Sequence, residues 1–133
     1  MDELLKIVEN PRVTVRRTGP PDPAGTCVVY WMQRAQRAVD NPALNVAVEA
    51  ANALARPAVV FFAPIPFYPH ANLRHYRFLA EGIPDIAASL AKRNIGFVLR
   101  RFPDLALVDD EPTWRPSFVV RQLATLAVAT GRD

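Results

Sequence analysis

The fold class of this chain is indicated most clearly by residues 28–47, VVYWMQRAQRAVDNPALNVA. A mostly apolar run over 26–32 predicts a strand buried on both faces, as in a parallel sheet. Pro42 suits the first position of a helix, and Asp40 or Asn41 can accept a hydrogen bond from the free amides of its first turn. The stretch therefore predicts a strand and a helix joined by a polar loop.

Strands and helices continue to alternate after this stretch. The first helix is expected to end near Ala55, and the second helix to begin near Leu73 with a kink or break at Pro84. Further strands are expected over 58–65, 96–101, 105–109 and 125–129, with a short helix over 116–124. This order predicts an α/β fold, namely a Rossmann-like three-layer α/β/α arrangement with a mostly parallel five-stranded sheet.

Helical spacing of apolar residues predicts which faces of the two helices pack on the sheet. The first helix places Leu44, Ala47, Val48, Ala51 and Leu54 on one face, and the second places Tyr76, Leu79, Ile83, Ile86 and Leu90 on one face. The linker TGPPDPAG, residues 18–25, separates this part from what precedes it. We therefore expect a helix, an arm and a linker over 1–25, and the α/β domain over 26–133.

Composition and charge set broad limits on function. The chain has 133 residues and a net charge of +3, which permits an anionic partner without requiring one. Cys27 is the single cysteine, so an internal disulfide and a cysteine-based zinc site are excluded. No apolar run approaches the ~18 residues of a membrane span, and the acidic start MDELLKIVEN is unlike a signal peptide. The cytoplasm is the expected compartment, with no membrane contact.

Familiar catalytic and phosphate-binding motifs are missing from the sequence. No GxGxxG or P-loop follows the first strand, and neither serine lies at a nucleophile elbow. His70 and His75 lack further ligands nearby, so we expect capping or solvent-facing roles and no metal. Trp31 and Trp114 are either packing residues, which is the favoured interpretation, or a stacking surface for a planar ligand. The sequence predicts no catalytic residue.

The quoted stretch resembles the start of the N-terminal domain of the DNA photolyase and cryptochrome family. The element RAVDNPAL, residues 37–44, matches the family at large, and YWMQR, residues 30–34, is similar to class II cyclobutane pyrimidine dimer photolyases. Residues 74–100 resemble the second helix and third strand of that class. Residues 107–124 are a looser match to its fourth strand and following helix.

This resemblance implies a role in light-driven DNA repair. Complete members of the family are deoxyribodipyrimidine photo-lyases, in which this domain is an antenna and packing module. FAD and the DNA lesion bind a separate, larger helical domain, which we expect to lie outside these 133 residues. The chain alone is therefore expected to hold no FAD and to be inactive. The resemblance leaves open whether an antenna pigment binds, and which one.

Polar residues at the carboxyl ends of the predicted strands are the candidate binding site. In an open parallel sheet the ligand crevice lies there, which selects Gln33, Arg34, Arg37, Asp109 and Glu111. The arginines either pair with acids and fix the loop, which is the favoured interpretation, or face a partner domain. The acids of 109–111 either hold Mg²⁺ or cap a strand-to-helix turn, the second being favoured.

One departure from the family concerns residues 101–105. The family places a helix between its third and fourth strands, but only three residues separate Arg101 from Leu105 here. A parallel crossover needs a dozen or more residues. Either the chain is broken at this point with residues missing, or residues 97–109 form a hairpin that turns at Pro103-Asp104.

An exposed apolar patch is expected where this domain meets a neighbour. Phe67, Tyr68 and Trp114 are the candidates, and the patch is either open or covered by a homodimer contact. The partner expected from the resemblance is the helical FAD-binding domain or a partner chain, with damaged DNA bound only through it. The alternative function is a standalone Rossmann-like module that docks on a helical partner or senses a nucleotide.

Overall fold

The computed structural model describes residues 2–17, 19–65 and 68–100, together with four two-residue strands further along the chain. Residues 1–64 and 68–100 form one compact unit, and the remaining residues form a second. The first unit begins with helix α1 (Asp2–Glu9), which packs against helix α2. It carries all of the parallel sheet.

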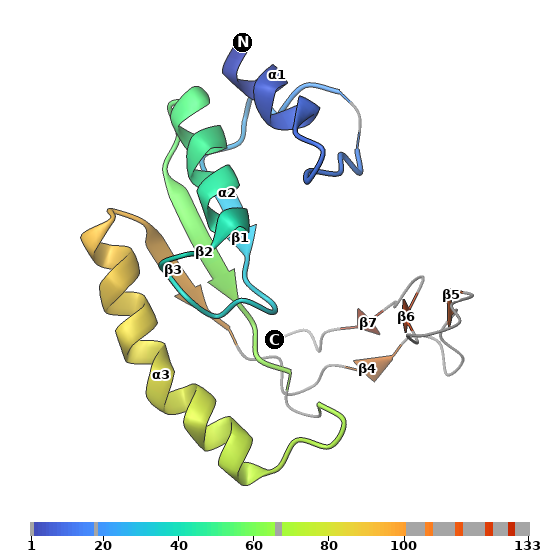
Figure 1. The fold of residues 1–133 in the computed structure, drawn as a ribbon, viewed down its shortest axis with the longest axis vertical. Coiled ribbons are helices and arrows are strands. Elements are labelled where there is room, and N and C mark those ends of the chain that lie inside the picture. Colours follow the sequence, from blue (N-terminus) through green and yellow to red (C-terminus); the bar gives the residue numbers. More distant parts are fainter. Residues whose placement is uncertain are drawn as a thin grey trace. The chain divides into compact units, whose positions relative to one another are not determined.

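A parallel three-stranded sheet forms the centre of this unit (Figure 1). In chain order the elements are β1 (Val28–Trp31), α2 (Pro42–Ala53), β2 (Ala58–Phe62), α3 (Leu73–Lys92) and β3 (Gly96–Leu99). The strand order is β1-β2-β3, and Tyr30 lies opposite Val60, which lies opposite Phe97. The two predicted helices that follow the first and second strands are confirmed, as are the first three strands, with ends that differ by a few residues.

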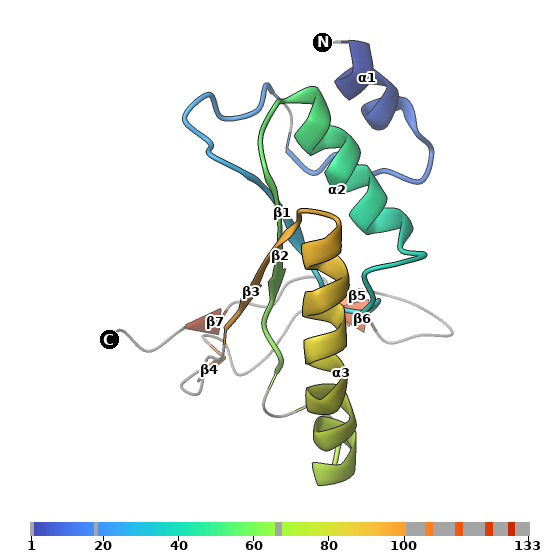
Figure 2. The same ribbon diagram turned by 90° about the vertical axis from the view of Figure 1, so that its left-hand side faces the viewer.

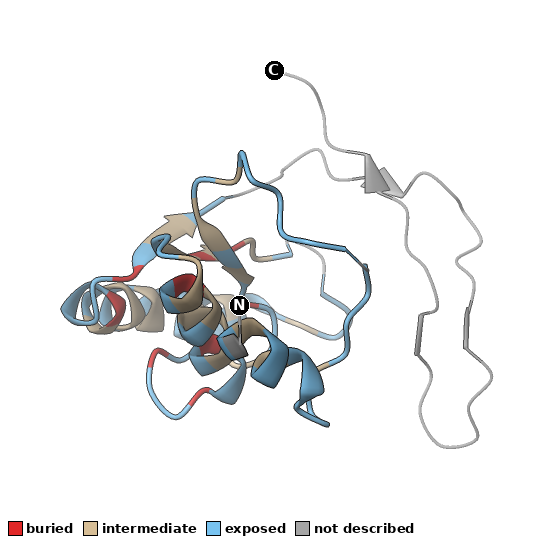
Figure 3. Cartoon of the chain, turned by 90° about the horizontal axis from the view of Figure 1, so that it is seen from above, coloured by how far each residue is buried: buried red, intermediate tan, exposed pale blue. Residues whose placement is uncertain are grey.

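Helices α2 and α3 lie on the same side of the sheet (Figure 2). This follows from handedness, because two right-handed crossovers that advance in the same direction place both of their helices on one face. The core between the helices and this face includes Met32, Leu44, Val60, Phe62 and Leu90, all buried (Figure 3). The predicted apolar faces of both helices are confirmed as the faces that turn inward.

The prediction that β1 is buried on both faces is wrong. Its residues alternate between partly buried and exposed, and Val29 and Trp31 are 57% and 60% exposed. Alternate side chains of a strand point to opposite faces of the sheet. Since α2 and α3 occupy one face only, Val29 and Trp31 project from the face that these helices leave uncovered.

Of the predicted kink or break at Pro84, the break is absent, because α3 runs through this residue from Leu73 to Lys92. A helical proline leaves the carbonyl four residues earlier, that of Ala80, without its usual amide donor. Ala80 and Pro84 are both exposed, so water can reach this carbonyl. Ile83 and Ile86 pack against the core on either side of the proline and hold the helix continuous.

The short strands of the second unit do not extend the parallel sheet. Strand β4 (Ala106–Leu107) pairs antiparallel with β7 (Val128–Ala129), and β5 (Trp114–Arg115) pairs antiparallel with β6 (Gln122–Leu123). The fourth and last predicted strands thus exist but pair with each other. Residues 122–123, expected in a helix, form a strand whose backbone bonds go to β5.

The length of the connection explains this difference. Six residues separate Leu99 from Ala106, which is too few for a parallel crossover, whereas antiparallel strands need only turns between them. The described fold is therefore α/β, with a sheet of three parallel strands. The predicted chain break between Arg101 and Leu105 lies outside the described residues. Among the helices of the described part, none is long and apolar enough to cross a membrane.

Candidate functional site

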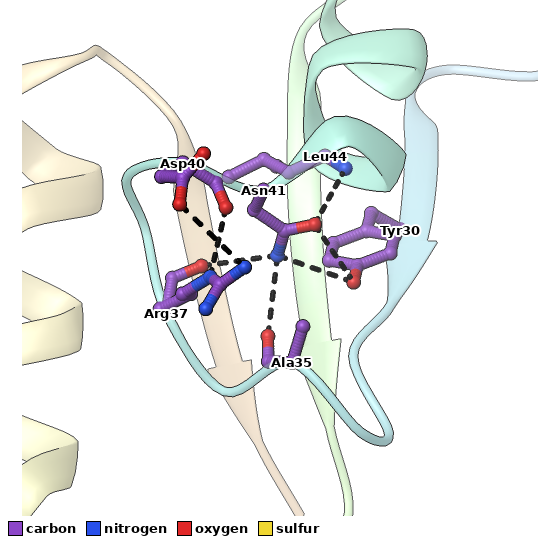
Figure 4. Close-up of polar contacts among 6 residues, drawn as sticks. All are labelled: Tyr30, Ala35, Arg37, Asp40, Asn41 and Leu44. Atoms are coloured by element: carbon purple, nitrogen blue, oxygen red, sulfur yellow. Dashed lines mark hydrogen bonds and ion pairs between the residues drawn. The ribbon is translucent and has the colours of Figure 1, made fainter.

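The loop between β1 and α2 is organised by the buried side chain of Asn41 (Figure 4). Its Oδ1 accepts a hydrogen bond from the backbone amide of Leu44 at 3.2 Å, which makes Asn41 the N-cap of α2. Its Nδ2 donates to the carbonyls of Ala35 at 3.2 Å and Arg37 at 3.0 Å. The capping prediction is confirmed for Asn41, and one amide joins the loop to the helix start.

Tyr30 of β1 completes this arrangement. Its hydroxyl oxygen lies 3.3 Å from Nδ2 and 3.5 Å from Oδ1 of Asn41, so the strand, the loop and the helix meet at a single side chain. A buried amide is costly unless its donors and acceptor are all used, and here they are. The network therefore holds residues 30–44 in one conformation.

Arg37 and Asp40 close the loop from its exposed side. Arg37 Nε donates to the Asp40 carbonyl at 2.8 Å, and a longer ion pair joins Nη2 to Oδ2 at 3.8 Å. Asp40 has φ of 49°, a left-handed conformation that aspartate tolerates better than most residues. The interpretation that an arginine fixes the loop is confirmed for Arg37, mainly through its backbone bond, since an exposed ion pair contributes little.

A second tie to the loop comes from Arg93, at the end of α3. Its Nη1 donates to the Ala38 carbonyl at 2.5 Å, and its Nη2 donates to Asn45 Oδ1 at 3.2 Å. Ala38 is buried and belongs to the core, so the loop packs inward against the helices. The sequence contains no local signal for this contact, because Arg93 and Ala38 are 55 residues apart.

The predicted crevice residues are only partly brought together. Gln33, Arg34 and Arg37 share the β1–α2 loop and are exposed there. Of these, Arg37 is engaged within the loop, whereas the Arg34 side chain meets no acid among the described residues. Asp109 and Glu111 lie outside the described residues, so a ligand role for this set stays a prediction.

The start of α3 carries a capping box that the sequence analysis missed. Asn72 Oδ1 accepts from the amides of Arg74 at 3.1 Å and His75 at 3.4 Å, and His75 Nδ1 accepts from the Asn72 amide at 3.1 Å. The spacing Asn-x-x-His was visible, but histidine is an unusual fourth member. The expectation of a capping histidine is confirmed for His75. Among the described residues no three potential ligands gather as a metal site requires.

The uncovered face of the sheet is apolar around Trp31. The indole ring lies edge-on to Phe61, with ring centroids 6.4 Å apart and an interplanar angle of 66°. Val29 lies on the same face two residues earlier, and Val98 lies opposite Phe61 on β3. Of the three predicted patch residues, Tyr68 is exposed, while the side chains of Phe67 and Trp114 lie outside the described residues.

The family of the chain follows from a match to the DNA photolyase family model over residues 28–129. The chain belongs to the DNA photolyase family. The matched region begins at the first residue of β1 and takes in the Tyr30–Asn41 network, both helices and all three parallel strands. These residues form an N-terminal domain of the photolyase type, as the sequence predicted.

Three curated relatives are named deoxyribodipyrimidine photo-lyase. The protein of Methanothermobacter thermautotrophicus is 47% identical over 81 residues, which is 61% of this chain and 18% of the relative. That of Oryza sativa subsp. japonica is 44% identical over 90 residues, 66% of this chain and 18% of the relative. That of Potorous tridactylus is 38% identical over 71 residues, 53% of this chain and 13% of the relative. No solved structure matches this chain.

The matched part thus spans between 13% and 18% of the length of these photolyase relatives. The described residues of the Asn41 network join β1, the following loop and α2 by hydrogen bonds. The described helices α2 and α3 leave the other face of the sheet uncovered (Figure 2). The chemistry named in the relatives is said of those proteins.

Proposed function

We propose that this chain is the antenna-type N-terminal domain of a class II photolyase, and that light-driven splitting of pyrimidine dimers belongs to the complete protein. The observation that carries the proposal is the family match over residues 28–129, supported by relatives named deoxyribodipyrimidine photo-lyase. The class II assignment rests on the resemblance of residues 30–34. The alternative of a standalone binding module is not favoured by these relatives.

Because this chain matches only a small part of its relatives, we assign cofactor and DNA binding to another part of the complete protein. FAD is a cofactor of the photolyase family, and we propose that a separate helical domain of the complete protein binds it together with damaged DNA. The described residues provide no Gly-rich turn for the pyrophosphate of a dinucleotide. This chain would therefore carry no FAD alone and would act as the surface on which the helical domain docks.

The loop residues have a defined place in this proposal. Arg34 and Gln33 are exposed on a loop that Asn41 and Arg93 hold rigid, which suits a contact surface. Together with Arg37, Asp109 and Glu111 they are the residues proposed to face an antenna pigment or the partner domain. In the complete domain we propose that the three described strands belong to a five-stranded, three-layer α/β/α fold in a cytoplasmic protein.

The mass and flavin content of the native protein test this proposal. An antibody raised against the described domain would isolate the protein from its source, for mass spectrometry and absorbance spectroscopy. We expect a mass several times the 14.8 kDa of this chain and close to one FAD per polypeptide. A native protein of 14.8 kDa without flavin would refute the proposal.

A further inference from the structure

A positively charged segment of the chain lies between α1 and β1. Residues 10–17, NPRVTVRR, contain three arginines and no acid, and we call them the basic arm. In Figure 1 the basic arm is the blue segment that follows α1. Arg12, Arg16 and Arg17 are exposed, and none of their side chains meets an acid among the described residues. The basic arm therefore presents three positive charges that the described part of the chain does not neutralise.

The fold gives other arginines partners that it does not give to those of the basic arm. Arg37 is paired with Asp40 inside its loop, and Arg77 Nε lies 3.6 Å from Glu81 Oε1 on α3. The match to the photolyase family model begins at Val28, so the basic arm lies outside the matched region. Neither the described contacts nor the family match accounts for the charges of the basic arm.

The start of the basic arm is anchored to the domain. The Arg12 amide donates to Asn10 Oδ1 at 3.0 Å, and the Val13 amide donates to the Asn10 carbonyl at 2.9 Å. Val13 is partly buried, and the preceding helix α1 packs against α2. Because this part of the backbone is already held, binding a ligand costs less conformational entropy than it would for a free tail.

The spacing and chemistry of the three arginines fit the phosphate backbone of duplex DNA. A guanidinium group is always charged and can donate two parallel hydrogen bonds to one phosphate. The five steps from Arg12 to Arg17 span at most about 18 Å, which corresponds to about five base pairs at about 3.4 Å each. A lipid surface fits less well, because the basic arm has no Trp, Phe or Leu side chain to insert into it.

We propose that the basic arm binds the phosphate backbone of duplex DNA without reading its sequence. This inference rests on the proposed function, because dimer repair brings DNA to the complete protein. The contact is additional to the one expected from the helical domain. Phosphate contacts release counterions and carry no sequence information, so the basic arm contributes a salt-dependent affinity that is the same for damaged and undamaged DNA.

The salt dependence of DNA binding by the complete native polypeptide tests the proposal. The probe is an undamaged duplex of about 30 base pairs, and fluorescence anisotropy measures its binding constant between about 50 and 200 mM KCl. In the arm variant, glutamine replaces all three arginines (Arg12→Gln, Arg16→Gln and Arg17→Gln). We expect the slope of log K against log salt concentration to become shallower by roughly two to three, since each phosphate contact contributes about 0.9.

Two further variants separate the basic arm from general effects of charge and from misfolding. The matched control removes three exposed cations outside the basic arm (Arg56→Gln, Arg74→Gln and Lys92→Gln), and its slope should change by less than about one. A variant with lysine at the three arm positions keeps the charge. Because counterion release depends on charge, its slope should stay within about one of the parent slope.

The outcomes distinguish this proposal from its alternatives. Equal slopes for the parent and the glutamine arm variant overturn it, and so does a control variant that loses as much slope. Arm-dependent binding to vesicles that contain phosphatidylserine, with an unchanged DNA slope, also overturns it, because the partner is then a lipid surface. Light-dependent dimer repair by the same samples reports the proposed function separately. An arm-dependent slope without repair or flavin would support the DNA contact while refuting the photolyase assignment, and repair with an unchanged slope would refute the DNA contact alone.

Discussion

Asn41 shows how much structure a single buried amide can specify. It caps α2, holds two carbonyls of the preceding loop and meets the hydroxyl of Tyr30. A capping residue alone contributes about 1 kcal/mol, but leaving several buried groups unpaired adds the cost of their lost hydration. The residue therefore stabilises the fold more than its capping role suggests.

Replacing Asn41 by alanine should lower the free energy of unfolding by roughly 2–4 kcal/mol, because the cap is lost and the buried partners are left unpaired. Asn41→Asp keeps the acceptor for Leu44 but cannot donate to the loop carbonyls, so its effect should be intermediate. Urea denaturation measures both. The control is Asn52→Ala on the exposed side of α2, and equal stabilities of the Asn41 and Asn52 variants would contradict this account.

Arg93 should behave as a tie between α3 and the loop. Arg93→Ala removes two hydrogen bonds to Ala38 and Asn45 and should lower stability by roughly 1–2 kcal/mol, since these bonds are partly exposed to water. Arg93→Lys should recover only part of the loss, because an ammonium group lacks the two-pronged geometry. The neighbouring exposed residue gives the control Lys92→Ala. If Lys92→Ala lowers the free energy of unfolding as much as Arg93→Ala does, the two hydrogen bonds of Arg93 do not stabilise the domain.

At the scale of elements, the sequence predicted what local periodicity and turn chemistry determine. The inward faces of α2 and α3, the start at Pro42 and the first three strands followed from spacing and capping rules. Exposure of Val29 and Trp31 could not be predicted, because a continuous apolar run looks the same whether a second layer covers it or not. The contact of Arg93 with Ala38 depends on tertiary packing, which no local pattern records.

Pro84 gives a test of helix α3. Because proline in a helix interior is about 3 kcal/mol less favourable than alanine, Pro84→Ala should stabilise the domain by roughly 1–3 kcal/mol. Thermal unfolding followed by circular dichroism would show this as a higher Tm. Asp85→Ala, at the next exposed position, should shift the Tm little. A lower Tm for Pro84→Ala would mean that the proline has a packing role that the described contacts do not include.

The capping box of α3 gives a second test at this scale. His75→Gln retains a side-chain acceptor for the Asn72 amide, whereas His75→Ala removes it. The alanine variant should be less stable by about 0.5–1 kcal/mol, and the glutamine variant should lie close to the parent. Urea unfolding distinguishes them. Identical curves for all three proteins would show that the histidine half of the box is dispensable.

For the molecule as a whole, the chain is a photolyase domain in which the Asn41 network joins a strand, a loop and a helix, and the described helices cover one face of the sheet only (Figure 2). The family model matches most of its length, and the stretches aligned with its three relatives are 13% to 18% of their lengths. We propose that the repair chemistry belongs to the complete protein, where a helical domain would hold FAD and the lesion.

Light-driven repair is the most direct test of this account. The complete native polypeptide and the 133-residue chain would each be incubated with DNA containing cyclobutane pyrimidine dimers, in the light and in the dark, and the remaining dimers counted. We expect loss of dimers only with the complete polypeptide and only in the light. Repair by the 133-residue chain alone, or no light-dependent repair by a flavin-loaded complete polypeptide, would contradict it.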